Sequence, residues 1–133
     1  MKAPTVFMLE IVLMATLAAS SACSRTQSLF SCDTEVAKEI PSPDGAFVAV
    51  VYRRDCGATT GFNTQVGLRR SRTEFDHDLG QVAAIGGQHD LKPLWTSTRH
   101  LTIPMPAGKV YRQLSKWKEV QIGYGTGPQE TNP

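Results

Sequence analysis

The strongest constraint on the fold is an apolar run at residues 46–53, which directly follows a Pro-Asp-Gly turn signal at residues 43–45. Proline presets its own φ and glycine accepts a positive φ, so these three residues favour a tight turn. The run itself supplies β-branched and aromatic side chains, among them Val50 and Tyr52. Because no polar residue interrupts the run before Arg53, it predicts a central β-strand.

The chain on either side of this run alternates between short apolar segments and turn residues, without a helical period. Residues 33–40 could form a short helical turn or an extended lead-in, and Pro41 ends either one. Further strands are predicted at residues 62–68, 81–85, 91–96, 101–103, 110–114 and 120–124. We therefore expect one small all-β domain over residues 32–124, a twisted meander of about six antiparallel strands, followed by a disordered tail over residues 125–133.

The amino terminus has the pattern of a secretory signal peptide, which we place at residues 1–22. Lys2 precedes an apolar stretch, and the part of it that follows Glu10 is nine residues long, from residue 11 to residue 19. A membrane-spanning helix needs about 20 apolar residues, so this stretch predicts an amino-terminal signal helix and not a span.

Small residues lead into Cys23, which predicts cleavage before this cysteine and its lipidation, with residues 23–31 as a flexible tether. Ser20 stands where a lipoprotein signal usually has an aliphatic residue. The alternative is cleavage near Ala22 that releases a soluble periplasmic protein.

The chain has three cysteines, and their odd number agrees with lipidation of one of them. If Cys23 carries acyl chains, Cys32 and Cys56 remain as an even pair in an oxidising compartment, where a disulfide is the expected state. A bridge between them would close a loop of about 25 residues and stabilise the fold by about 3.5 kcal/mol. The alternative is a reactive Cys56 thiolate with a histidine as its base.

Residues 42–66 also resemble a family of small bacterial envelope proteins and lipoproteins. That family shares a Ser-Pro-Asp-Gly turn, a following strand and an Arg-Asp-Cys-Gly-Ala-Thr-Thr-x-Phe-x-Thr-Gln-Val signature. This chain carries the turn at residues 42–45 and the signature at residues 54–66. Members also have a cysteine upstream of the turn, as Cys32 is here. The resemblance extends over about residues 32–124 and implies the β-fold and the disulfide, but it implies no activity.

Charged residues are grouped along the chain, although the formal net charge is only +2. The best ligand hypothesis from these groups is an anion site at the loop that follows the central strand. There, Arg53 or Arg54, the backbone amides of residues 57–61 and the hydroxyls of Thr59 and Thr60 would cradle the anion, with Gly57 opening the loop. Solvated strand faces and loops are the simpler interpretation of the same residues.

Two of the three histidines lie beside carboxylates, in the run of residues 76–78 and in the pair of residues 89–90, and the third is His100. Imidazole and carboxylate groups are zinc ligands, but these residues lie in polar segments where solvation is the ordinary state, so we predict no metal and no cofactor.

The sequence therefore favours a lipid-anchored binding or structural module of the cell envelope without catalytic activity. Its expected contacts are the bilayer, through the lipid anchor, and an envelope protein, glycan or lipid that binds the hairpin loop. Nucleic acid is not an expected partner in that compartment. The alternatives are a periplasmic immunity or inhibitor protein, and a metal-dependent hydrolase that uses His77, His89 or His100.

Overall fold

The computed structural model describes residues 32–57 and 60–126. The predicted signal helix, the lipidation site at Cys23 and the tether lie outside these residues, as does Thr59. Within the described part of the chain, no helix is long and apolar enough to cross a membrane.

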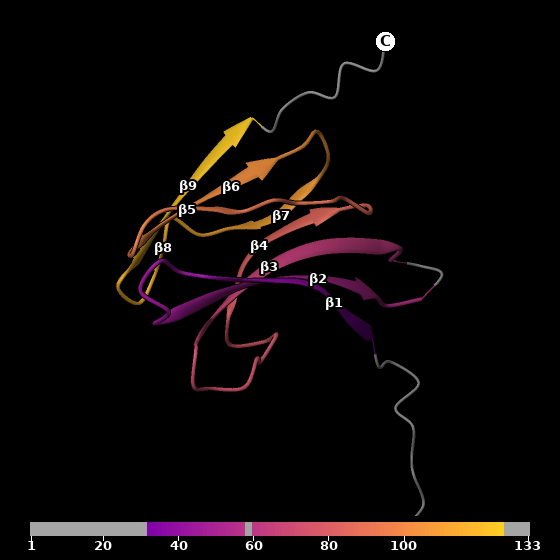
Figure 1. The fold of residues 1–133 in the computed structure, drawn as a ribbon. Coiled ribbons are helices and arrows are strands. Elements are labelled where there is room, and N and C mark those ends of the chain that lie inside the picture. The colour runs from indigo at the N-terminus through magenta and orange to yellow at the C-terminus, as the bar shows by residue number, and fades with distance from the viewer. Residues whose placement is uncertain (1–31, 58–59, 127–133) are drawn as a thin grey trace, which may run out of the picture.

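The described chain forms nine β-strands, which are arranged in two sheets (Figure 1). Five of them form one sheet in the order β1-β2-β3-β4-β7, and we call it the large sheet. The other four form the small sheet in the order β5-β6-β9-β8. The strands are β1 (Asp33–Pro41), β2 (Phe47–Asp55), β3 (Phe62–Arg70), β4 (Gln81–Gly86), β5 (Leu94–Ser97), β6 (His100–Met105), β7 (Val110–Gln113), β8 (Lys116–Trp117) and β9 (Val120–Thr126).

All neighbours in the large sheet are antiparallel, whereas β6 and β9 in the small sheet are parallel. Parallel strands need a crossover connection, and here the chain between β6 and β9 contributes β7 to the large sheet before it returns as β8. The chain therefore passes between the sheets instead of following a simple meander.

One apolar core lies between the two sheets. Alternate residues of β2 supply Phe47, Ala49 and Val51 to it, and β6 and β9 of the small sheet supply Leu101, Ile103, Val120 and Ile122. Phe47 is completely buried and contacts the ring of Trp117 edge-to-face at a centroid distance of 6.1 Å. Burying one such side chain contributes about 1.5–3 kcal/mol, so this face is the main source of stability.

The opposite face of β2 is covered by residues 71–80, the connection between β3 and β4. Val48, Val50 and Tyr52 form a second apolar cluster against Phe75. The Tyr52 and Phe75 rings are 4.9 Å apart, and the Tyr52 hydroxyl donates a hydrogen bond of 3.3 Å to the His77 carbonyl. Burial raises the pKa of Tyr52 above its usual range.

The all-β class is thus confirmed, and so is the central strand, since β2 is buried on both faces. The extended alternative for residues 33–40 is also confirmed, because they form β1 with a β-bulge between Val36 and Lys38. The described residues form nine strands where the sequence predicts about six. The predicted strand at residues 110–114 is present as β7, and the two-residue β8 has no expected counterpart because so short a strand carries no burial pattern of its own.

The predicted Pro-Asp-Gly turn is present, and Asp44 organises it. Gly45 has φ 70° and donates to the Ser42 carbonyl. One oxygen of Asp44 accepts the Ser42 hydroxyl at 2.7 Å and the Ala46 amide at 3.1 Å, and the other accepts Arg99 Nη1 at 2.7 Å. The Ser42 hydroxyl above all, and then Arg99, lower the pKa of Asp44 to about 2.

We expect an NMR titration of the Asp44 carboxyl group to give a midpoint of about 2, compared with 3.8 for a free aspartate. Because this pKa is depressed in the folded state, ionised Asp44 stabilises the protein fully above pH 4, and the contribution is lost as the pH falls towards 2. Ser42→Ala and Arg99→Ala should each raise the midpoint. A native midpoint near 3.8 would show that the turn lacks these contacts.

Gly80 is the last residue of the covering segment, residues 71–80, and it binds this segment to β3. Its carbonyl accepts the Leu68 amide at 2.8 Å, and a Cβ at this position would lie within van der Waals overlap of the Leu68 carbonyl oxygen. Gly80→Ala should therefore lower the free energy of unfolding by about 1–3 kcal/mol in urea denaturation. Gly123→Ala is the matched control, because its Cβ would meet nothing nearer than Thr102 Oγ1 at 3.7 Å. Equal effects of the two substitutions would refute the steric argument.

Candidate binding site

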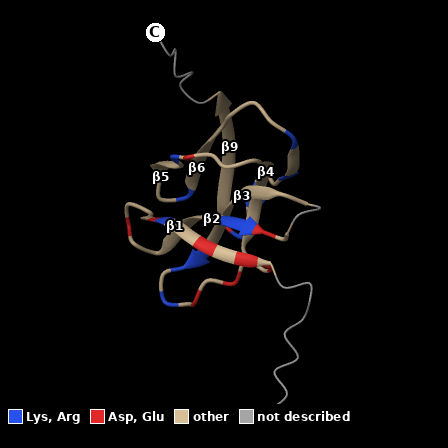
Figure 2. Ribbon diagram, turned by 90° about the vertical axis from the view of Figure 1, so that its right-hand side faces the viewer, with Lys and Arg blue, Asp and Glu red and all other residues tan. Residues whose placement is uncertain are grey.

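The antiparallel pairing of β1 with β2 gathers charged residues at the carboxyl end of β2. Asp33 stands opposite Asp55 and Glu35 stands opposite Arg53. On the other side of β2, Asp55 pairs with Phe62 of β3. Residues opposite one another in a sheet share a face, so these five side chains lie on the face of the sheet that also carries the core. Figure 2 shows the acidic positions of β1 beside the basic end of β2.

A cavity of about 230 Å³ opens at this end of the large sheet. We call it the acidic pocket. Its lining residues come from β1, β2, β3 and the segment after β4; they are Asp33, Thr34, Glu35, Arg53, Asp55, Phe62 and Gln88. The first residue of β3 is at its rim, since Phe62 is 49% exposed.

Thr64, which is completely buried, positions the segment that carries Gln88. Its hydroxyl donates to the Gly87 carbonyl at 2.8 Å and accepts the His89 amide at 2.9 Å, so both neighbours of Gln88 are bound to it. The Gly87 amide in turn donates to the Phe62 carbonyl at 2.9 Å. No sequence motif marks Gln88, because its position depends on these contacts across 25 residues of chain.

The pocket is negative overall. Three carboxylates face one guanidinium, which gives a formal charge of −3 + 1 = −2. Arg53 forms no ion pair within 4.0 Å with any described residue, and its Nε atom is buried without a hydrogen-bond partner. Like charges directly opposite each other, as Asp33 and Asp55 are, destabilise a strand pair. A cationic group in the pocket would relieve that repulsion.

The predicted disulfide closes this end of the sheet. Cys32 and Cys56 are bonded, with their Cα atoms 4.1 Å apart, which confirms the pairing expected from the cysteine count. Each cysteine is directly next to one of the opposed aspartates. The bond therefore holds Asp33 and Asp55 together against their mutual repulsion.

The two arginines of the predicted anion site are separated in the structure, and Thr59 of that site lies outside the described residues. Arg53 and Arg54 lie on opposite faces of β2, and Arg54 Nη1 lies 3.8 Å from Asp78 in the segment that covers the outer face. The loop amides are used internally: Gly57 donates to Asp55 Oδ1, and Thr60 and Gly61 donate to the Gly57 carbonyl. The described residues thus leave an anion few free donors in this loop.

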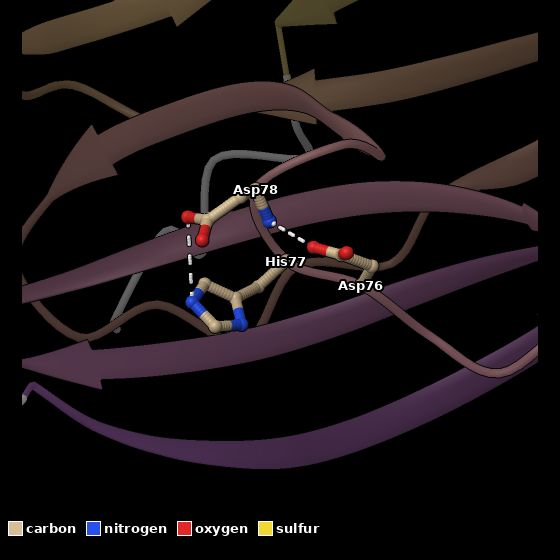
Figure 3. A group of neighbouring side chains, drawn as sticks. All are labelled: Asp76, His77 and Asp78. Carbon is tan, nitrogen blue, oxygen red and sulfur yellow. Dashed lines mark hydrogen bonds and ion pairs between the residues drawn. The ribbon is translucent and has the colours of Figure 1, made fainter.

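Asp76, His77 and Asp78 form the group of possible metal ligands in the described chain, with their ligand atoms within 4.8 Å of one another (Figure 3). One polar side-chain atom of each residue already has a partner. His77 Nε2 lies 3.4 Å from Asp78 Oδ1, and Asp76 Oδ1 accepts the backbone amides of Asp78 and Leu79. The positive charge of the nearby Arg54 guanidinium also disfavours a bound cation here. These contacts therefore stabilise the conformation of the loop.

The other two histidines lie apart from this group. His89 Nε2 donates to the Gly86 carbonyl at 2.8 Å, and its neighbour Asp90 is paired with Lys38. His100 is an exposed residue of β6 in the small sheet. The structure therefore does not gather His77, His89 and His100 into one site.

Comparison with family models, with curated proteins and with solved structures finds no match for this chain. The resemblance to an envelope-protein family stays a prediction, and so do export and lipidation.

We expect the double variant Cys32→Ser/Cys56→Ser to lose about 3.5 kcal/mol of unfolding free energy in urea denaturation, because the loop is no longer closed in the unfolded chain. Amide hydrogen exchange should also become faster in residues 33–36, where the two aspartates are no longer held together.

A reducing agent is the matched control: it should destabilise the natural chain by the same amount and leave the double variant unchanged. Free thiols at both cysteines in protein purified without reductant would contradict the bond.

Proposed function

We propose that this protein is a non-catalytic binding module of the bacterial cell envelope, tethered through a lipid on Cys23, and that its binding site is the acidic pocket. The observation that carries the proposal is the pocket itself, in which three carboxylates and one arginine line a cavity beside the disulfide. The ends of the predicted hairpin loop, Asp55 and Phe62, both contribute to its wall.

The chemistry of the pocket fits a cationic side chain of a protein partner. Its formal charge of −2 attracts a lysine or arginine, and its volume of about 230 Å³ accommodates a side chain of that size. Phe62 at the rim offers an aromatic face, which attracts a cation within about 6 Å of the ring centre. Gln88 adds an amide that can hydrogen-bond an ammonium or guanidinium group.

The position of the pocket fits a tethered protein. Asp33 lines the cavity and follows directly after Cys32, the residue at which the predicted tether joins the domain. A partner held in the same membrane would therefore meet the pocket at the tethered end of the domain. The envelope location itself is supported by the signal-peptide pattern and by the disulfide, because disulfides persist in oxidising compartments.

The test is site-specific photo-crosslinking in living cells. The photoreactive phenylalanine derivative benzoylphenylalanine replaces Phe62 in the full chain, expressed from its own signal sequence, and adducts are identified by mass spectrometry. We expect a defined protein adduct at this position, and we expect Glu35→Lys to remove it because the substitution changes the formal pocket charge from −2 to 0.

Two controls make this experiment decisive. The same derivative at Leu94, an exposed residue of the small sheet, should not give that adduct. Glu74→Lys makes the same charge change at an exposed position on the covering segment and should leave the Phe62 adduct intact. The same adduct from Leu94, or an adduct that survives Glu35→Lys, would refute the acidic pocket as the binding site.

A further inference from the structure

β1 is an edge strand of the large sheet, with β2 on one side and no described strand on the other. Alternate residues of an edge strand direct their backbone N–H and C=O groups away from the sheet, where they can pair with another strand. Proteins normally cover or blunt such edges. On β1, the half of the strand after the bulge is covered and the half before it is open.

The half that follows the bulge is covered by residues 90–95. Trp95 Nε1 donates to the Ile40 carbonyl at 3.0 Å. Lys38 Nζ contacts the Asp90 carboxylate and, at 3.5 Å, the Leu91 carbonyl. These contacts occupy the place that an additional strand would need.

The half before the bulge is open. Residues 33–36 are all exposed, and among the described residues they make no backbone hydrogen bond except those of the ladder with β2. Asp33, Thr34 and Glu35 from this half line the acidic pocket. The open backbone and the pocket are therefore one continuous surface.

We propose that residues 33–36 accept an extended basic segment of the partner protein as an additional strand, which places one of its lysine or arginine side chains in the acidic pocket. This inference rests on the proposed function and names the way in which the partner binds. Main-chain hydrogen bonds to the edge would supply affinity, and the pocket would select the side chain. The side chains of an added strand alternate between faces, so basic residues at every second position fit best.

An exposed strand edge can also pair with the same edge of a second copy of the chain. The charges of residues 33–36 disfavour that pairing. Residues 33–36 contain two carboxylates and no cation, so pairing this segment with itself would bring like charges together. The same charges disfavour neutral and acidic strands. A basic extended segment is the complementary occupant.

The test uses the full chain, extracted from membranes in detergent, and the synthetic peptide acetyl-TKVKTK-amide. We expect binding by fluorescence anisotropy and slower hydrogen exchange in residues 33–36. Acetyl-TEVETE-amide should not bind, Glu35→Lys should abolish binding, and Glu74→Lys should leave it unchanged.

Two N-methylated forms of the basic peptide separate strand addition from simple side-chain binding. One carries methyl groups on the backbone nitrogens of the three lysines, and the other carries them on the remaining three nitrogens. Only one set of nitrogens faces β1, so strand addition predicts that one form loses affinity by about tenfold or more while the other retains it.

The outcomes distinguish the two proposals. If both methylated forms bind as well as the unmodified peptide, and Glu35→Lys still abolishes binding, strand addition is wrong and the acidic pocket remains the binding site. If the unmodified basic peptide does not slow hydrogen exchange in residues 33–36, strand addition is also wrong. The crosslinking at Phe62 then decides the proposed function independently.

Discussion

Both faces of β2 must be kept from water, and the remaining structure is arranged to do so. The strand presents an unbroken apolar run, so neither of its faces can remain in water. The small sheet covers the face of Phe47, Ala49 and Val51, and residues 71–80 cover the face that carries Tyr52. This explains why the chain leaves the large sheet after β4, forms β5 and β6, and returns for β7: a second layer is needed over β2. The carboxyl end of the same strand is where the apolar run stops and the acidic pocket begins.

The parts of the fold that depend on local sequence could be predicted from it. The turn at residues 43–45, β2 and β3 follow from residue types within a few positions of one another, and the disulfide agrees with the pairing expected if Cys23 is lipidated. The assignment of β7 to the large sheet could not be predicted, since its four residues are all exposed and carry no burial pattern. The parallel pairing of β6 with β9 depends equally on packing between distant segments.

Only part of the candidate site can be predicted from the sequence. The sequence marks the segment around Arg53 as a candidate site, and there Arg53 is followed by Arg54, whereas across the sheet Arg53 stands opposite Glu35 of β1. Glu35 reaches Arg53 only through the β1–β2 register, and the bulge at Val36 and Lys38 separates the register of the two halves of β1. A shift by one residue would have turned Asp33 and Glu35 to the other face. Register of this kind depends on the whole sheet, and a single sequence does not determine it.

The Cys32–Cys56 bond also determines how the domain responds to force. A pull applied at the amino-terminal end of the described chain enters at Cys32 and passes through the sulfur atoms to Cys56, at the end of β2. The segment between the two cysteines, which contains β1, carries none of the load. Without the bond, the same pull would unzip β1 from β2 one hydrogen-bonded pair at a time, beginning at Asp33. With it, β2 also lies outside the covalent path of the load, tension passes along the chain from Cys56 towards β3, and the edge strand with its acidic pocket keeps its shape.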